Sequence, residues 1–347
     1  MQDILNKFNF KGDIIEIIEN RIGLINTTYV VTSTIEKYIL QKINNSIFKN
    51  PKDLMENISL VTDYLKDLDH KTLDIIKNKE GEPYVIYNKE YWRAFRYIKS
   101  RVYQKAKNIQ IVSESGNKLA IFHRDLQNFP ANDLKNTIKD FHNTEIIFKR
   151  FQDLLLNVSR DLSDECFDQI NYILSQEKEI KTFSDLLANK KVPLRVCHND
   201  PKISNFLFDD KDKAICLIDL DTLMPGTLLL DIADAIRTIC VSEDENESDI
   251  TKLYLKHDYF ESFLKSYLEV NIKNLNFHEL NNIVKSVELI FLEQGIRFLT
   301  DYLNGNSYFK IDYKNQNLVR AKNQLYLSEQ VAKDKNHFDM IVKRYIK

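Results

Sequence analysis

The segment CHNDPKISNFLFDDKDKAICLIDLD, residues 197–221, combines His, Asp, Lys and Asn side chains with short apolar runs. Residues 206–208 (FLF) and 214–218 (AICLI) are apolar and flank the charged turn DDKDK, so they predict a small β-hairpin. A further apolar run, residues 192–197 (VPLRVC), precedes the polar residues. The segment therefore predicts a strand, a polar loop and a hairpin, in that order.

The predicted hairpin brings Asn205, which precedes its first strand, beside Asp219, which follows its second strand. Antiparallel pairing places the start of one strand next to the end of the other. An amide oxygen and a carboxylate are hard ligands of the kind that Mg²⁺ prefers, with phosphates and water completing the octahedron. Asp221, two residues further along, either completes this metal site or faces solvent.

The polar loop has the spacing of a kinase catalytic loop. Asp200 follows His198 by two residues, and Lys202 and Asn205 follow Asp200 by two and by five. In phosphoryl transfer the carboxylate orients the attacking hydroxyl and accepts its proton, the lysine balances charge on the moving phosphoryl group, and the asparagine holds magnesium. The loop thus predicts phosphoryl transfer from ATP, with Asp200 and Lys202 as the catalytic candidates.

A second segment, HRDLQNFP at residues 123–130, also looks like a kinase loop. Pro130 occupies the position at which the loop needs a metal-binding asparagine, and no hairpin with a terminal acid follows. We therefore expect His123 and Asp125 to lie on an ordinary helix surface.

Outside this region, the N-terminal part of the chain predicts hairpins and one helix, and the C-terminal part predicts helices. The predicted strands cover residues 29–33, 37–43, 83–87 and 91–98, and the helix begins at Pro51. The predicted C-terminal helices cover residues 228–239, 259–270, 283–303 and 318–332. This asymmetry predicts an α+β protein with a β-rich N-terminal lobe, residues 1–98, and a mainly helical C-terminal lobe, residues 99–347, that carries the catalytic loop.

The N-terminal lobe should supply a cation to the nucleotide phosphates, and Lys42 in YILQKIN is the candidate. Gln41 competes for this position, in which case the two-residue period of a strand places Lys42 on the opposite face. The turn segment GLINTTY contains a single glycine, Gly23, where phosphate loops carry several. On the predicted helix, Glu56 lies opposite the apolar stripe, so we expect it to be solvated.

The composition indicates which classes of partner the protein does not bind. The 49 basic and 51 acidic residues nearly cancel and alternate along the chain, which gives no basic surface for a nucleic acid. The four cysteines form no zinc-binding spacing and are expected to be reduced, buried thiols. The first twenty residues lack the apolar core of a signal peptide, and no stretch of about 18 apolar residues exists. We expect a cytoplasmic protein that contacts neither nucleic acid nor membrane.

The segment HNDPKISNFLFD…CLIDLDTLMPGTLLLDIADAIR resembles the aminoglycoside phosphotransferase and choline kinase superfamily, and most closely its N-acetylhexosamine 1-kinases. The segments GLINTTYVV, YILQKINNSIFKNPKDLMENI, YWRAFRYI, FHNT and RFLTDYLNGNSYF are similar to that family as well. The resemblance implies a protein-kinase-like fold in which the N-terminal lobe clamps ATP and the C-terminal lobe receives a sugar.

By this resemblance Asp200 is the catalytic base, and Asn205 and Asp219 are the magnesium ligands, with Asn205 also at the nucleotide. His198 is expected to shape the loop as a buried histidine bonded to backbone. Asp231 is expected to bond the backbone of the catalytic loop. The alternative is a plain helix N-terminal acid, stabilised by the helix dipole alone.

For the acceptor sugar, the resemblance and the apolar surroundings of the segment GIRFLTDYLNGNSYF point to Arg297 and Tyr308. Pairing of Arg297 with Asp301 at i,i+4 is the alternative, a contact worth a few tenths of a kcal/mol. His142 in FHNT either lines the sugar site or is a satisfied core histidine.

The expected reaction is ATP- and Mg²⁺-dependent phosphorylation of an N-acetylhexosamine at its anomeric hydroxyl. Another small-molecule kinase of the same superfamily, acting on an aminoglycoside, choline, homoserine or a different sugar, is the first alternative. A pseudokinase that binds without turnover is the second.

Overall fold

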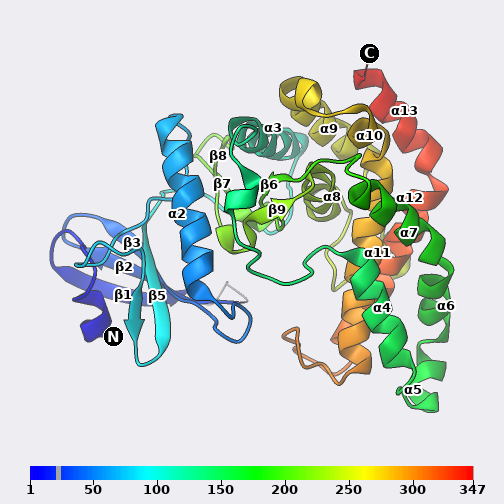
Figure 1. Ribbon diagram of the computed structural model, residues 1–347, viewed down its shortest axis with the longest axis horizontal. Helices are drawn as coiled ribbons and strands as arrows, with labels where there is room; N and C mark the ends of the chain where they lie inside the picture. Colours follow the sequence, from blue (N-terminus) through cyan, green and yellow to red (C-terminus); the bar gives the residue numbers. More distant parts are fainter. Residues whose placement is uncertain (21–24, 347) are drawn as a thin grey trace.

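The computed structural model describes residues 1–20 and 25–346, and it has the predicted β-rich N-terminal and helical C-terminal lobes. Figure 1 shows the N-terminal sheet at one end, the long C-terminal helices at the other, and helix α2 between them. The sheet is antiparallel with the order β1-β2-β3-β5-β4. Its strands are β1 (Ile14–Asn20), β2 (Thr27–Ser33), β3 (Lys37–Lys42), β4 (Val85–Tyr87) and β5 (Glu90–Arg96).

Both predicted N-terminal hairpins are confirmed, as β2 with β3 and as β4 with β5. Strand β1 was not predicted. It is an edge strand whose side chains are mostly exposed, so the sequence IIEIIEN does not show the alternation that marks a half-buried strand. The turn predicted at Gly23 lies outside the described residues.

Helix α2 (Pro51–Asp67) begins at Pro51, as predicted from the Asn50-Pro51 pair. Leu54, Ile58, Val61 and Leu65 form its buried stripe. Full burial of each such side chain stabilises the fold by about 1.5 to 3 kcal/mol. Glu56 is exposed on the opposite side of the helix, as expected.

The C-terminal lobe is built around helix α11 (Ile283–Leu303), which is buried on nearly all sides and packs against α4, α8, α12 and α13. This environment explains why apolar residues occur on all sides of the helix, with some buried polar residues among them. The four predicted C-terminal helices are confirmed. The main helices of this lobe are α3 (Ile109–Asp125), α4 (Thr144–Leu155), α8 (Leu228–Ile239), α9 (His257–Asn271), α12 (Gln316–Lys333) and α13 (Lys335–Tyr345). Across the described chain no helix is both long and apolar enough to span a bilayer.

The short strands around the catalytic loop form two small sheets. Strand β7 (Phe206–Phe208) pairs antiparallel with β8 (Ala214–Leu217), which confirms the predicted hairpin. Strand β6 (Arg195–Cys197) pairs antiparallel with β9 (Met224–Gly226). The loop is therefore anchored at both ends by strand pairing.

A buried polar contact joins the segment after α2 to helix α3. His70 Nδ1 lies 2.6 Å from Asp125 Oδ2, and His70 Nε2 lies 3.1 Å from Lys118 Nζ. Asp125 is therefore not an ordinary surface residue, which corrects the prediction, because the imidazole of a different lobe covers it. Burial, helped by the nearby Lys118 charge, lowers the pKa of His70 below its usual value.

This contact makes part of the stability pH-dependent. Because the folded protein favours neutral His70, the unfolded chain takes up a proton first as the pH falls through about 6.5. The contribution of His70 is therefore fully present above that pH and lost below it. We expect the difference in free energy of unfolding between the wild type and His70→Asn to shrink on acidification, measured by urea titration from about pH 8 to pH 5. A difference that stays constant or grows would contradict this assignment.

Candidate active site

The catalytic loop is held by one buried carboxylate, Asp231, in the first turn of α8. Its two oxygens accept hydrogen bonds from consecutive backbone N–H groups, His198 N at 2.7 Å and Asn199 N at 2.6 Å. The role that the resemblance implied for Asp231 is confirmed. Although burial alone would raise it, hydrogen bonds and charge from His123 and His198 lower the pKa of Asp231.

His123 completes this anchor from helix α3. Its Nε2 lies 2.8 Å from Asp231 Oδ2, and its Nδ1 lies 2.7 Å from the hydroxyl of Tyr267. The side chain of His123 is wholly buried. The prediction that it lies on a helix surface is wrong, because α3 packs against α9 and its inward face meets α8.

His198 is a scaffold, as predicted. It is fully buried, its Nε2 lies 2.9 Å from the carbonyl oxygen of Ile218, and its Nδ1 accepts from Asp200 N at 3.3 Å. One imidazole thus ties the catalytic loop to the end of strand β8.

The structure brings Asp200, Lys202 and Asn205 together, as predicted from their spacing. Lys202 Nζ donates to Asp200 Oδ2 at 2.6 Å and lies 3.9 Å from Asp219 Oδ2. Asn205 Nδ2 donates to the backbone oxygen of Asp200 at 2.8 Å. Burial alone would lower the pKa of Lys202, but the carboxylates of Asp200 and Asp219 raise it above its usual value. The ammonium group therefore stays charged beside the two acids.

The hairpin brings the backbone of Asn205 against Ile218, the residue before Asp219, since Ile218 N donates to Asn205 O at 2.9 Å. Asp219 has φ = 63°, a left-handed conformation that turns the chain away from β8. The Asn205 amide uses its nitrogen for Asp200, which leaves its oxygen for a metal. Across the described ranges no group of three or more His, Cys, Asp or Glu side chains is arranged to hold a metal. An amide and a carboxylate that share magnesium with nucleotide phosphates fit this donor set.

Asp221 is buried, so the alternative in which it faces solvent is wrong. Its Oδ1 accepts from Arg93 Nη1 at 2.5 Å, and its Oδ2 accepts from Asn26 Nδ2 at 2.6 Å. Both partners belong to the N-terminal lobe. Sequence reasoning missed Arg93, although a lone arginine within the apolar strand YWRAF was a signal that it faces a polar partner.

Lys42 lies on the other face of the sheet. Its Nζ donates to Glu90 Oε1 at 2.9 Å, and its side chain is 36% exposed. Lys42 pairs with Trp92 of the outer core, whereas Gln41 pairs with Arg93. This geometry agrees with the alternative, in which Gln41 faces the C-terminal lobe and Lys42 faces away from it. The identity of the phosphate contact stays a prediction.

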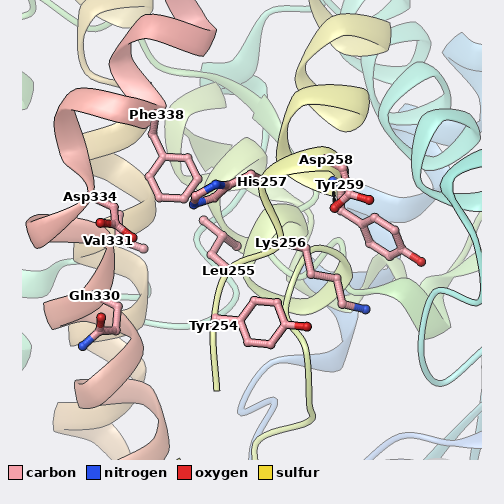
Figure 2. A pocket seen from close by; sticks show the side chains of 10 residues that line it. All are labelled: Tyr254, Leu255, Lys256, His257, Asp258, Tyr259, Gln330, Val331, Asp334 and Phe338. Carbon is pink, nitrogen blue, oxygen red and sulfur yellow. Dashed lines mark hydrogen bonds between the residues drawn. The ribbon is translucent and has the colours of Figure 1, made fainter. Parts of the chain in front are cut away.

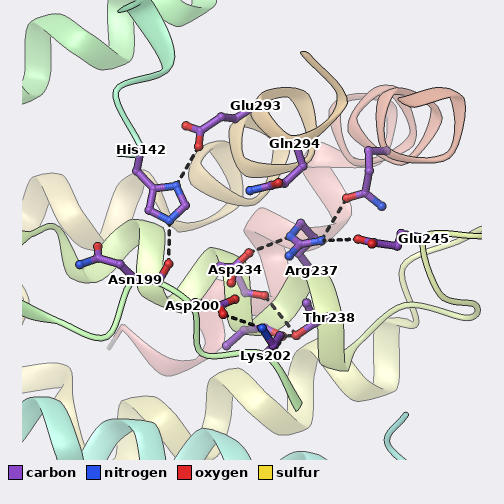
Figure 3. A network of polar contacts seen from close by, with 12 residues as sticks. His142, Asn199, Asp200, Lys202, Asp234, Arg237, Thr238, Glu245, Glu293 and Gln294 are labelled. Carbon is purple, nitrogen blue, oxygen red and sulfur yellow. Dashed lines mark hydrogen bonds and ion pairs between the residues drawn. The ribbon is translucent and has the colours of Figure 1, made fainter. Parts of the chain in front are cut away.

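Beside the catalytic loop, α8, α11 and two neighbouring loop residues, His142 and Glu245, contribute charged and amide side chains that we call the α8–α11 polar cluster. It comprises His142, Asp234, Arg237, Glu245, Glu293, Gln294 and Arg297. Figure 3 shows Asp234 and Arg237 next to Asp200 and Lys202.

Within this cluster the carboxylates have cationic partners. Arg237 Nε donates to Asp234 Oδ1 at 2.7 Å, and Arg237 Nη1 lies 3.8 Å from Glu245 Oε2. Glu293 lies 2.8 Å from His142 Nδ1 and also accepts from Thr144. Although burial opposes it, Glu293 raises the pKa of His142.

Of the two alternatives for His142, the structure supports a core histidine whose ring nitrogens both have hydrogen-bond partners. Its Nε2 lies 2.9 Å from the carbonyl oxygen of Asn199, so the ring bridges α11 and the catalytic loop (Figure 3).

Arg297 does not pair with Asp301. Its guanidinium lies over the rings of Phe141 and Phe309, 5.5 and 5.6 Å from their centroids, and donates to Gln294 at 3.3 Å. Asp301 instead accepts from the backbone N–H groups of residues 307–309, which shapes the loop that carries Tyr308. Tyr308 is 55% exposed.

A pocket of about 700 Å³ lies away from these residues, between the start of α9 and helices α12 and α13 (Figure 2). His257, which lines it, stacks on His337 with ring centroids 4.3 Å apart. None of the candidate catalytic residues lines this pocket.

A family model described as a phosphotransferase enzyme family matches residues 16–259, well over half of the chain. The matched range begins in β1 and ends in α9, so it includes the catalytic loop and both candidate magnesium ligands.

Three solved structures share the fold. An aminoglycoside phosphotransferase from Alicyclobacillus acidocaldarius has a TM-score of 0.68 at 14% identity, over 99% of this chain and 96% of that chain. A spectinomycin phosphotransferase in complex with ADP and spectinomycin has a TM-score of 0.55 at 15% identity, over 97% and 94%. A choline kinase from Cryptosporidium parvum Iowa II has a TM-score of 0.54 at 14% identity, over 97% and 94%.

The anchoring role of Asp231 predicts a large loss of stability when its carboxylate is removed. Asp231→Ala leaves two buried backbone N–H groups and His123 without their acceptor, so it should lower the free energy of unfolding by about 3 to 5 kcal/mol. Urea unfolding at neutral pH measures this change. The control is Asp168→Ala, which removes an exposed acid from the first turn of another helix and should cost less than about 1 kcal/mol. Equal losses in the two variants would show that Asp231 is not an anchor.

Proposed function

The chain belongs to the phosphotransferase enzyme family, and we propose that it transfers the γ-phosphoryl group of ATP to the anomeric hydroxyl of an N-acetylhexosamine. The geometry that carries the reaction class is the catalytic loop, in which Asp200, Lys202 and Asn205 converge beside Asp219. The amino-sugar acceptor rests on the sequence resemblance and on the charge pattern of the α8–α11 polar cluster.

In this proposal Asp200 orients the attacking hydroxyl and accepts its proton. Lys202 remains cationic between Asp200 and Asp219 and balances negative charge as the phosphoryl group moves. Asn205 and Asp219 would hold magnesium, which when bound neutralises charge on the phosphates. Asp231 and His198 fix the loop so that the carboxylate of Asp200 is positioned before the substrates arrive.

The charge pattern of the polar cluster favours an uncharged acceptor rich in hydroxyl groups. A cationic acceptor such as choline or an aminoglycoside needs a carboxylate that is free to pair with it. Among the described residues of the cluster, Asp234 pairs with Arg237 and Glu293 with His142. Glu245 lies within ion-pair distance of both Arg237 and Arg320. Hydroxyl and amide groups of a sugar, by contrast, bond to such paired groups without adding an unbalanced charge.

Arg297 is the proposed acceptor-recognition residue on α11, with Tyr308 nearby on the loop shaped by Asp301. The contact of its guanidinium with two aromatic rings fixes the plane of the group while only one of its donors bonds to Gln294. The remaining donors suit the oxygen atoms of a sugar.

The proposal is tested by ADP release in a coupled assay. We expect magnesium-dependent turnover with N-acetylglucosamine or N-acetylgalactosamine, because the cluster offers paired polar groups, and less with galactose, choline or an aminoglycoside. A sugar 1-phosphate product, identified by NMR, distinguishes the anomeric hydroxyl from other positions. Preference for a cationic acceptor would favour the first alternative, and nucleotide binding without turnover on any acceptor would favour a pseudokinase.

Asp200→Asn should lower kcat by roughly 10² to 10⁴, because the amide cannot accept the hydroxyl proton. ATP affinity, measured by titration calorimetry, should stay within about threefold of the wild type, because the role of Asp200 concerns the acceptor. The control Asp210→Asn changes an exposed acid in the β7–β8 turn and should keep full turnover. Wild-type turnover in Asp200→Asn would rule out the proposed base.

A further inference from the structure

We propose that Arg93 on β5 is the residue of the N-terminal sheet that binds the nucleotide phosphates, and that Asp221 is its counter-ion in the nucleotide-free protein. This inference rests on the proposed function, since it requires that the protein bind a nucleotide. It assigns the phosphate contact to a residue on a different strand from the one predicted.

The register of the sheet places Arg93 on the face directed at the C-terminal lobe. Arg93 pairs with Gln41 across β3 and β5, and Gln41 pairs with Thr28 across β2 and β3. The side chains follow the same path, since Arg93 Nε donates to Gln41 Oε1 at 2.9 Å and Gln41 Nε2 donates to Thr28 Oγ1 at 3.0 Å. Gln41 is neutral, so the cation at this point of the sheet comes from Arg93.

The other basic residues of β2, β3 and β5 do not replace it. The side chains of Lys42 and Arg96 lie on the opposite face of the sheet from Arg93. They bond to Glu90 and to Asp74, respectively, at the sheet surface. Lys37 shares the face of Arg93 but is exposed at the start of β3. Four residues separate Lys37 from Gln41, which corresponds to about 13 Å along a strand.

Helix α2 does not provide an acid to Arg93. The residue of α2 that approaches the guanidinium is Met55, whose Sδ lies 3.9 Å from Arg93 Nη1, whereas Glu56 is exposed. A protein-kinase lysine at the phosphates pairs with a glutamate of the corresponding helix. In this protein the acid comes instead from Asp221, on the segment that also carries the candidate metal ligand Asp219.

Arg93 and Asp221 therefore form a buried ion pair across the two lobes. Arg93 is 1% exposed and Asp221 is 4% exposed. A buried charge without a partner is strongly unfavourable, so each group needs the other until a replacement arrives. The phosphates of ATP bring such a replacement, because the planar guanidinium matches phosphate oxygens with two parallel hydrogen bonds.

The exchange also concerns Asp219. Asp221, the partner of Arg93, lies two residues beyond the candidate metal ligand Asp219 on the same segment. When Arg93 turns to the phosphates, Asp221 needs another cation, and a divalent metal suits a carboxylate. Nucleotide and metal should therefore bind together more tightly than either binds alone.

The test compares Arg93→Met with the control Lys42→Met. Lys42 follows Gln41, the cross-strand partner of Arg93, and its side chain lies on the opposite face of the sheet. Dissociation constants for adenosine, AMP, ADP and ATP are measured by titration calorimetry at fixed ionic strength. Arg93→Met should weaken ADP and ATP binding by about tenfold to a hundredfold, because it removes hydrogen bonds to a charged group, and should leave adenosine within about twofold. Lys42→Met should leave all four within about twofold.

Two other results of these titrations would count against the proposals. Equal loss of adenosine and ATP affinity, or unchanged ATP affinity, in a folded Arg93→Met protein would overturn the proposal while the proposed function stands. A wild type that binds none of the four ligands would instead reject the proposed function. If Arg93→Met fails to fold because Asp221 is left unpaired, the same series is run on Arg93→Met/Asp221→Asn, which leaves no buried lone charge.

Asp221→Asn provides an independent readout. Loss of the resting counter-ion frees the guanidinium, so ADP affinity without magnesium should rise by about threefold or more. The gain in ADP affinity on adding magnesium should be smaller than in the wild type. Weaker magnesium-free ADP binding in a folded Asp221→Asn protein would show that the ion pair is only structural.

Discussion

The carboxylate of Asp231 is the constraint on which the catalytic loop depends. The loop runs between two short strands, and the N–H groups of His198 and Asn199 are buried there. Without Asp231 these two donors would have no hydrogen-bond acceptor, which is costly in a water-free interior. One side chain satisfies both donors and is itself fixed by His123 from α3. The position of Asp200, the proposed base, is thus set by helices that are distant in sequence.

A second theme is the pairing of charges across the molecule. Asp221 is matched by Arg93, Asp234 by Arg237, and Glu293 by His142. Each pair is buried, where the attraction between charges is strong but the loss of hydration is large. All three acids belong to the C-terminal lobe, and only Asp221 takes its partner from the N-terminal lobe. Under our proposal, nucleotide phosphates replace Asp221 as the partner of Arg93, so that binding exchanges one buried ion pair for another.

Much of the fold could be predicted because its signals are local. The hairpin of β7 and β8 followed from two apolar runs around a charged turn, and α2 followed from Asn50-Pro51 and an apolar stripe. Strand β1 was missed because an edge strand exposed on both sides carries no alternation. His123 and Asp125 were misplaced because a helix surface in sequence becomes an interior once α8, α9 and the segment after α2 cover it.

By itself the sequence determined the elements whose geometry is short-range. Asp200, Lys202 and Asn205 lie close together because only a few residues of chain separate them. The antiparallel β7–β8 hairpin places the end of β8, next to Asp219, beside Asn205 at the start of β7. The faces on which Gln41, Lys42 and Arg93 lie were decided by tertiary structure, because strand alternation gives two faces and only the packing of the lobes determines which one is inside. Residues from separate lobes meet only after the chain has folded, so no local pattern records their pairing.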